Sequence, residues 1–200
     1  MGYFTNLRVT RNLKRLKSDK KKVREKGVWN LVEIKDAEAL SPAVDPLIEI
    51  LKDKHEDSWT RRGAVKALLH AHDFRAVGPF IEAAGDDDRE VREEAIEAVG
   101  LINLVLRRKG LLPVGIDSLV AAYNDEDIFV KSEAIRALGF TGVGQSLLVE
   151  ALKHERALVR STAAEALGYL GDTQSIQPLL EASTDEESFV RESASWALVC

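Results

Sequence analysis

Residues 86–100, with the sequence DDDREVREEAIEAVG, contain a pattern that recurs along the chain. An apolar residue and a base, Val91-Arg92, are followed after two variable positions by a set of small and aliphatic residues. The basic position recurs in five good copies, after a degenerate copy at Arg24; it is Arg61, Arg92, Lys131, Arg160 and Arg191, at intervals of 31, 39, 29 and 31 residues. A period of this size predicts an array of stacked repeats.

Each repeat reads as a hairpin of two helices. At 100° per residue, Val91, Ala95 and Ala98 fall on one arc of the second helix and Glu93, Glu94 and Glu97 on the opposite arc, which predicts one buried and one free face. Acids in the preceding turn suit the N-terminus of that helix. We expect glycines to close the second helices as left-handed caps, at Gly100, Gly139, Gly168 and Gly171.

These patterns predict an all-α protein, an α-α superhelix of about five to six helical hairpins. Residues 1–19 form a basic capping helix in this interpretation, and residues 20–200 form the solenoid. Trp59 aligns with Phe129, Leu158 and Phe189, and we expect all four side chains in the core. Trp29 and Trp196 share an outward register, where each is either a contact anchor or covered by neighbouring chain.

Composition favours a folded chain, with 45% apolar and 30% charged residues. We expect a cytoplasmic location, because no apolar run is long enough to span a membrane and the N-terminus is too charged for a signal peptide. The single cysteine, Cys200, permits no internal disulfide. Residues 1–26 hold ten Lys or Arg against two acids, whereas the net charge of the whole chain is −5.

The segment from Leu158 to Gly168, followed by Leu170-Gly171-Asp172, resembles the HEAT-like repeat family, in the short-period form named after the phycocyanobilin lyases. The resemblance covers residues 20–200. It implies a right-handed α-α superhelix, a HEAT-like solenoid, whose second helices line a concave, ligand-facing side. It also implies a ladder of bases that pair with acids such as Asp86, Asp125 or Asp185. Lys131 departs from this pattern, because lysine cannot reproduce a bidentate arginine contact.

We expect no enzyme activity, no metal and no cofactor. The resemblance includes iron-dependent hydroxylases with His-Glu pairs directly after the repeated base, but here those positions hold other residues. The pairs His55-Glu56 and His154-Glu155 lie in turns, in the wrong register to converge on one metal. His70 and His72 are interpreted as the end of a helix.

The free positions of the second helices predict a non-enzymatic scaffold that binds a partner protein along the concave face, with an acidic centre around Glu93–Glu97. The predicted partner-binding residues are Arg62, Lys66, Glu93, Glu94, Glu97, Glu133, Arg136, Glu165 and Trp196. One alternative is binding of nucleic acid or an anionic surface by the basic arm, formed by Arg8, Arg11, Lys14, Arg15, Lys20, Lys21 and Lys22. A second alternative is a subunit that acts like a bilin lyase.

Two irregularities interrupt the repeat. The 39-residue interval carries extra residues around 103–113, which either prolong a helix or form a loop with Arg107, Arg108 and Lys109 at its tip. The final residues 196–200 are apolar and lack a polar cap. This apolar end predicts self-association or cover by another surface.

Overall fold

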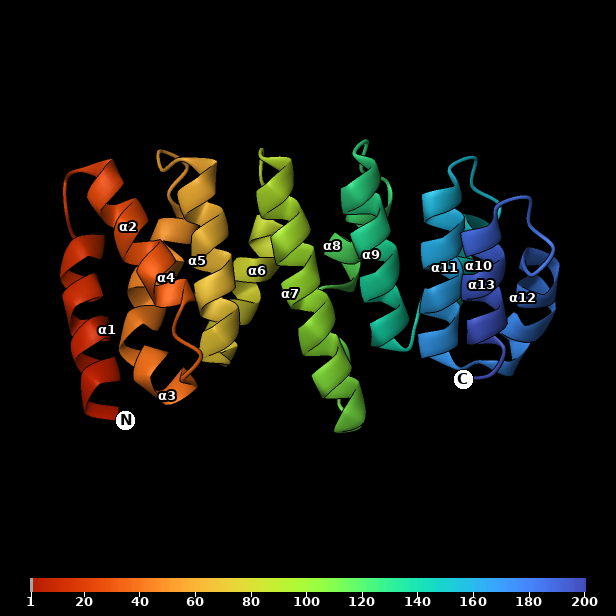
Figure 1. Ribbon diagram of the computed structural model, residues 1–200, viewed down its shortest axis with the longest axis horizontal. Helices are drawn as coiled ribbons and strands as arrows, with labels where there is room; N and C mark the ends of the chain where they lie inside the picture. Colours follow the sequence, from red (N-terminus) through yellow and green to blue (C-terminus); the bar gives the residue numbers. More distant parts are fainter. Residues whose placement is uncertain (1) are drawn as a thin grey trace. The chain divides into compact units, whose positions relative to one another are not determined.

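The computed structural model describes residues 2–200, with side chains described from Phe4 onward. Within those residues the chain consists of α-helices, short 3-10 helices and turns, with no strand (Figure 1). Contacts divide the chain into two compact units, Met1–Ala98 and Val99–Cys200, and the boundary falls inside helix α7 (Arg89–Arg108). The all-α prediction is confirmed.

Unit 1 begins with the pair α1 and α2, which pack against each other, followed by short turns and further hairpins. Its helices before α7 are α1 (Gly2–Leu16), α2 (Lys21–Val32), α3 (Ala37–Leu40), α4 (Val44–Lys52), α5 (Ser58–Ala71) and α6 (Val77–Ala83), with 3-10 turns at Ser41–Ala43 and Phe74–Ala76. The second helix α5 packs between α2 and the first helix α4. The repeated hairpin pattern therefore forms as the sequence predicts.

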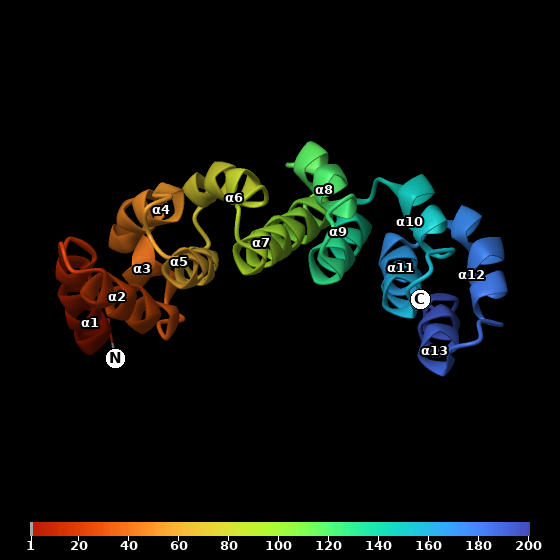
Figure 2. The same ribbon diagram turned by 90° about the horizontal axis from the view of Figure 1, so that it is seen from above.

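Unit 2 contains the end of α7 and three hairpins. Their helices are α8 (Ile116–Tyr123), α9 (Ile128–Thr141), α10 (Gln145–Ala151), α11 (Ala157–Leu170), α12 (Ile176–Ala182) and α13 (Ser188–Ala197), with a 3-10 turn at Thr173–Ser175. The second helices α9, α11 and α13 lie in one layer, and the first helices α8, α10 and α12 lie in the other (Figure 2).

The small residues of the repeat let the second helices approach closely. The buried side of α9 includes Ala134, Ile135, Ala137 and Leu138, which are fully inaccessible to solvent. A Cβ added to Gly139 of α9 would come within 2.7 Å of the carbonyl oxygen of Ala166 in α11. Only glycine fits at such a contact between two backbones.

The prediction of four left-handed glycine caps is wrong for three of them. Gly100, Gly139 and Gly168 lie inside α7, α9 and α11, where they permit close packing against the next helix. Gly171 does adopt a left-handed conformation, with φ of 68°, at the C-terminus of α11. Sequence alone does not separate these two uses of glycine, because both place it near the end of an apolar run.

Two of the repeated bases, Arg61 and Arg160, contact a carboxylate of the next repeat, as the family resemblance implies. Arg160 donates from Nε and Nη2 to the two oxygens of Asp185, at 2.7 and 2.8 Å. Lys131 instead donates to the carbonyl oxygen of Tyr123 at 2.7 Å. In its repeat, the position 25 residues after the base holds Arg156 rather than an aspartate, so the usual acidic partner is missing.

Candidate interaction faces

The charged positions on the second helices of unit 1 largely satisfy one another. Arg62 of α5 donates to Glu94 at 3.0 Å and to Glu90 at 2.7 Å, and Lys66 lies 2.6 Å from the same Glu94 carboxylate. Burial alone would lower the pKa of Arg62, but Glu94 and Glu90 raise it, so the guanidinium stays charged. Glu94 is mostly buried, whereas Glu97 is exposed. The predicted acidic centre is therefore substantially neutralised by its own neighbours.

The two tryptophans of unit 1 cover each other. Trp29 of α2 and Trp59 of α5 stack with ring centroids 4.3 Å apart, and the Arg62 guanidinium lies 5.7 Å from the Trp59 centroid. The indole nitrogen of Trp29 is buried without a hydrogen-bond partner. Trp29 therefore packs within unit 1, which is one of the two roles the sequence left open for it.

The prediction that Trp59, Phe129, Leu158 and Phe189 belong to the core is wrong. These side chains are between 40% and 51% exposed. Each lies in the first turn of a second helix, and the stripe that continues from it at i+4, i+7 and i+11 is the stripe predicted to be free. Alignment of apolar residues was interpreted as a core signal, but the register places them on the stripe that was predicted to be free.

In unit 2 this stripe exposes a set of large apolar side chains on the second helices of three successive hairpins. We define the apolar face as the exposed residues Phe129 of α9, Leu158 and Tyr169 of α11, and Phe189 and Trp196 of α13. Large exposed apolar side chains that recur on one surface often mark an interaction site. Trp196 was predicted at a partner-binding position, and it is 41% exposed. The others were missed as site residues.

The polar side chains between the ends of the stripe are already engaged. Glu133, predicted to be free, is instead buried and ion-paired with Arg136 one turn later. Thr162 is buried and donates to the carbonyl oxygen of Leu158 at 2.8 Å. Glu165 accepts a hydrogen bond from Ser193 at 3.1 Å. Each of the first two contacts lies within one helix, and the contact between Glu165 and Ser193 joins α11 to α13. All three engage polar groups of the stripe inside the protein.

Aromatic rings line the C-terminal end of the same stripe. Phe140 and Tyr169 contact edge to face with centroids 5.1 Å apart, and Tyr169 and Trp196 do so at 5.3 Å. Gly168 makes room for this row, since a Cβ there would lie 2.9 Å from the Trp196 ring. Such contacts hold the rings in fixed positions, which lowers the entropy lost when a partner binds.

The extra residues of the long repeat extend α7 by more than one turn. Arg107, near its end, donates to the carbonyl oxygens of Tyr169 at 2.9 Å and Leu170 at 2.8 Å, where α11 ends. It also reaches the carbonyl of Gly139 in α9 at 3.3 Å. Of the two forms expected, the structure therefore shows the prolonged helix, with an arginine that binds the ends of two second helices.

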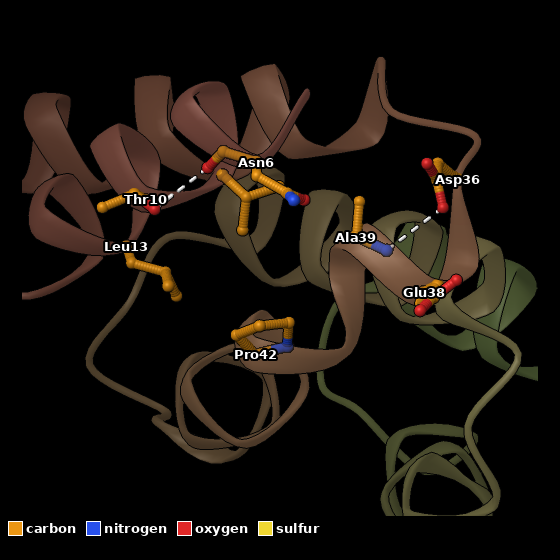
Figure 3. A pocket seen from close by; sticks show the side chains of 8 residues that line it. Asn6, Thr10, Leu13, Asp36, Glu38, Ala39 and Pro42 are labelled. Atoms are coloured by element: carbon orange, nitrogen blue, oxygen red, sulfur yellow. Dashed lines mark hydrogen bonds between the residues drawn. The ribbon is translucent and has the colours of Figure 1, made fainter. Parts of the chain in front are cut away.

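A pocket of about 480 Å³ lies in unit 1 between α1 and the turn at α3 (Figure 3). Asn6, Thr10 and Leu13 line it from α1, facing Asp36, Glu38 and Pro42. Asp36 already accepts a hydrogen bond from the backbone of Ala39 at 3.1 Å, as the cap of α3. The sequence did not indicate this pocket, because it forms outside the repeated pattern. Its lining places no His, Lys or Arg beside the carboxylates, and the hydroxyl of Thr10 donates to the carbonyl oxygen of Asn6 at 2.9 Å.

The basic arm keeps most of its charges exposed, among them Arg8, Arg11 and Lys14 on α1. Arg15 donates to the side chain of Asn12 at 2.8 Å, and Lys21 donates to the carbonyl of His55 at 2.6 Å. No group of three or more potential metal ligands occurs in the described part of the chain. Within that part, no helix combines the length and apolar character that crossing a bilayer requires.

Comparison with known proteins agrees with this architecture. The model of HEAT repeats matches residues 9–99, 44–139 and 116–199, and the chain belongs to this family. An engineered protein is similar in structure, with 22% identity, a TM-score of 0.72, and 96% of this chain and 95% of that chain covered. A search of the curated proteins gave no match.

Two further solved structures are similar in fold. A designed armadillo repeat protein in complex with the peptide (KR)4 has 18% identity and a TM-score of 0.73, over 94% of this chain and 97% of that chain. The complex of CpcE and CpcF of phycocyanin lyase from Nostoc has 21% identity and a TM-score of 0.64, over 92% and 73%. The HEAT/armadillo-type solenoid fold predicted from the sequence is thus confirmed.

Proposed function

We propose that this protein is a non-enzymatic scaffold that binds a partner protein, and that the apolar face of unit 2 is the main binding surface. One observation carries the proposal. Exposed apolar side chains repeat at one register on the second helices of three successive hairpins, at Phe129, Leu158 and Phe189. Burial of large aromatic and aliphatic side chains supplies most of the free energy of protein association.

The arrangement of the face supports a binding role rather than chance exposure. Its side chains project from helices that are held together by buried alanines and glycines. A rigid surface of this kind loses little conformational freedom when a partner docks. Tyr169 and Trp196 belong to the residue types that dominate interface energies.

The predicted charged residues keep a secondary place in this proposal. Arg62, Lys66 and Glu94 form a cluster within unit 1, and exposed Glu97 lies on the same helix as Glu94. Charges that already have partners add little affinity for a third group, because a partner must displace an existing ion pair. We therefore place the main energy of binding on the apolar face and assign the paired charges to positioning.

The test compares tagged bait proteins in native-cell lysate. Wild-type protein and a Leu158→Ser, Phe189→Ser variant are used for affinity capture, and recovered proteins are quantified by mass spectrometry. The matched control is Ile176→Ser, Leu180→Ser, because Ile176 and Leu180 are 49% and 47% exposed but lie on the first helix α12. A partner that is recovered with the wild type and the control, and lost with the first variant, supports the proposal. Equal recovery with all three baits rejects it.

A further inference from the structure

We infer that the apolar face of unit 2 binds a protein segment whose apolar side chains are flanked by Lys or Arg. This inference rests on the proposed function, and it adds the chemistry of the partner. Its basis is a pairing of charge and apolar character that repeats in three successive hairpins of the unit.

In each hairpin, an exposed glutamate precedes by three positions the residue of the apolar face that lies in the first turn of the second helix. The pairs are Glu126 and Phe129, Glu155 and Leu158, and Glu186 and Phe189. Each glutamate lies in the turn that leads into a second helix, and each apolar residue lies in the first turn of that helix, so both groups occur at the same end of the second helices. The side chain of Glu186 is 84% exposed even though it lies 3.5 Å from the Arg160 guanidinium.

The corresponding glutamate in unit 1 is buried rather than exposed. Glu56 precedes Trp59 by three residues, but its side chain is only 2% exposed and it forms an ion pair with Arg24. Its charge is therefore already used inside the protein. A glutamate at this position can therefore form an ion pair inside the protein. In unit 2 the three glutamates at this position are instead exposed to solvent.

The wider charge of unit 2 has the same sign. Residues 99–200 contain 14 Asp or Glu and nine Lys or Arg. Several of those bases are engaged internally, such as Arg107, Lys131 and Arg160 with carbonyl or carboxylate oxygens. Arg156 is an exposed base in the same turn as Glu155, and it reduces the effect at that repeat. A phosphate backbone would be repelled by this surface, whereas a segment rich in Lys and Arg would be attracted.

Helix spacing sets the design of a probe. Packed helices lie about 8–10 Å apart, and a chain in the polyproline II conformation advances about 3.1 Å per residue with three residues per turn, so every third side chain lies on the same side. An apolar residue at every third position can therefore meet Phe129, Leu158 and Phe189 in turn. The probe is a fluorescently labelled 15-residue peptide of five Leu-Lys-Lys units. Its two matched controls are peptides of five Leu-Glu-Glu units and five Ser-Lys-Lys units.

Affinity is measured by fluorescence anisotropy with the full chain. The Leu-Lys-Lys peptide is expected to bind at least about tenfold more tightly than either control peptide, because it alone has both apolar anchors and basic flanks. The triple variant Glu126→Lys, Glu155→Lys, Glu186→Lys is expected to lose that preference. A variant with the same change in charge, Asp117→Lys, Glu150→Lys, Glu181→Lys, places the new bases on the first helices and is expected to keep most of it.

Three results would overturn the inference. The first is binding of the Leu-Lys-Lys peptide no tighter than that of the Leu-Glu-Glu peptide, absence of any binding included. The second is equal affinity for the Ser-Lys-Lys peptide, and the third is equal weakening by the two triple variants. None of these rejects the proposed function, since a cellular partner that requires Leu158 and Phe189 would still be captured in the pull-down.

Discussion

Arg61 of α5 holds the carboxylate of Asp86 through two parallel hydrogen bonds, from Nε to Oδ2 at 3.0 Å and from Nη2 to Oδ1 at 2.7 Å. Lys54 donates to the same Oδ2 at 2.7 Å. Asp86 is almost fully buried, and it lies in the turn between α6 and α7 of the following hairpin. This contact therefore ties one hairpin of unit 1 to the next through charged groups with little access to water.

We expect Asp86→Ala to destabilise the protein by about 3–5 kcal/mol, because removal of one partner leaves the buried guanidinium of Arg61 without its counter-charge. The measurement is the free energy of unfolding from urea denaturation, followed by circular dichroism. Asp87→Ala is the control, since Asp87 is exposed in the same turn. An equal, small effect of both changes would show that the buried pair contributes no special stability.

The same pair predicts how stability depends on pH. Burial alone would raise the pKa of Asp86, but hydrogen bonds from Arg61 and Lys54 lower it below the ordinary value of 3.8. A carboxylate with a lowered folded-state pKa stabilises the protein fully above its unfolded-state pKa, and this stability is lost as pH falls through the folded-state pKa. Urea titrations at a series of pH values should show that Asp86→Asn flattens the loss of stability below about pH 4. An unchanged slope would contradict the assignment.

Much of the fold could be predicted from sequence because the repeat encodes it locally. The period of the basic residues gave the number of hairpins, and the alternation of alanine and glutamate along α7 gave the buried side of that helix. The pocket between α1 and α3 could not be predicted, since it depends on how nonrepeated segments meet. The repeat period predicts the elements that recur, but it does not predict how the nonrepeated segments pack.

The chemistry of the candidate site differs from what the sequence suggested. The stripe of free positions was predicted on the second helices as a charged one, yet its members Glu133 and Glu165 are engaged with neighbours. The exposed groups are Phe129 and Leu158, which apolar alignment had assigned to the core. Apolar character alone cannot distinguish a core position from a docking position, because both favour the same residue types. The position of Phe129 four residues before Glu133, on the same side of α9, was the information that could have identified it as exposed.

The internal glycines give a prediction about packing. Gly139→Ala should destabilise unit 2 by about 1–3 kcal/mol, because the new Cβ would meet the backbone of Ala166 and the helices would have to separate. Gly78→Ala is the matched control. Gly78 lies in α6 with nothing within 4 Å of an added Cβ, so alanine there should be neutral or stabilising. Thermal unfolding of both variants measures the difference, and a Gly139→Ala variant as stable as the wild type would show that the close approach is not required.

Arg107 gives the inserted segment a structural role. This role can be separated from the effect of its positive charge by comparison with the neighbouring Arg108. Its guanidinium bonds the last carbonyls of α11 and a carbonyl of α9, which lack intrahelical donors at the helix ends. We expect Arg107→Ala to cost about 1–2 kcal/mol, a value kept low because the side chain is partly in water. Arg108→Ala removes the same charge from the adjacent exposed position and should change stability by less than about 0.5 kcal/mol. Hydrogen exchange should also show faster opening of amides near residue 170 in the Arg107 variant alone. Equal behaviour of the two variants would mean that the extension of α7 does not stabilise the ends of α9 and α11.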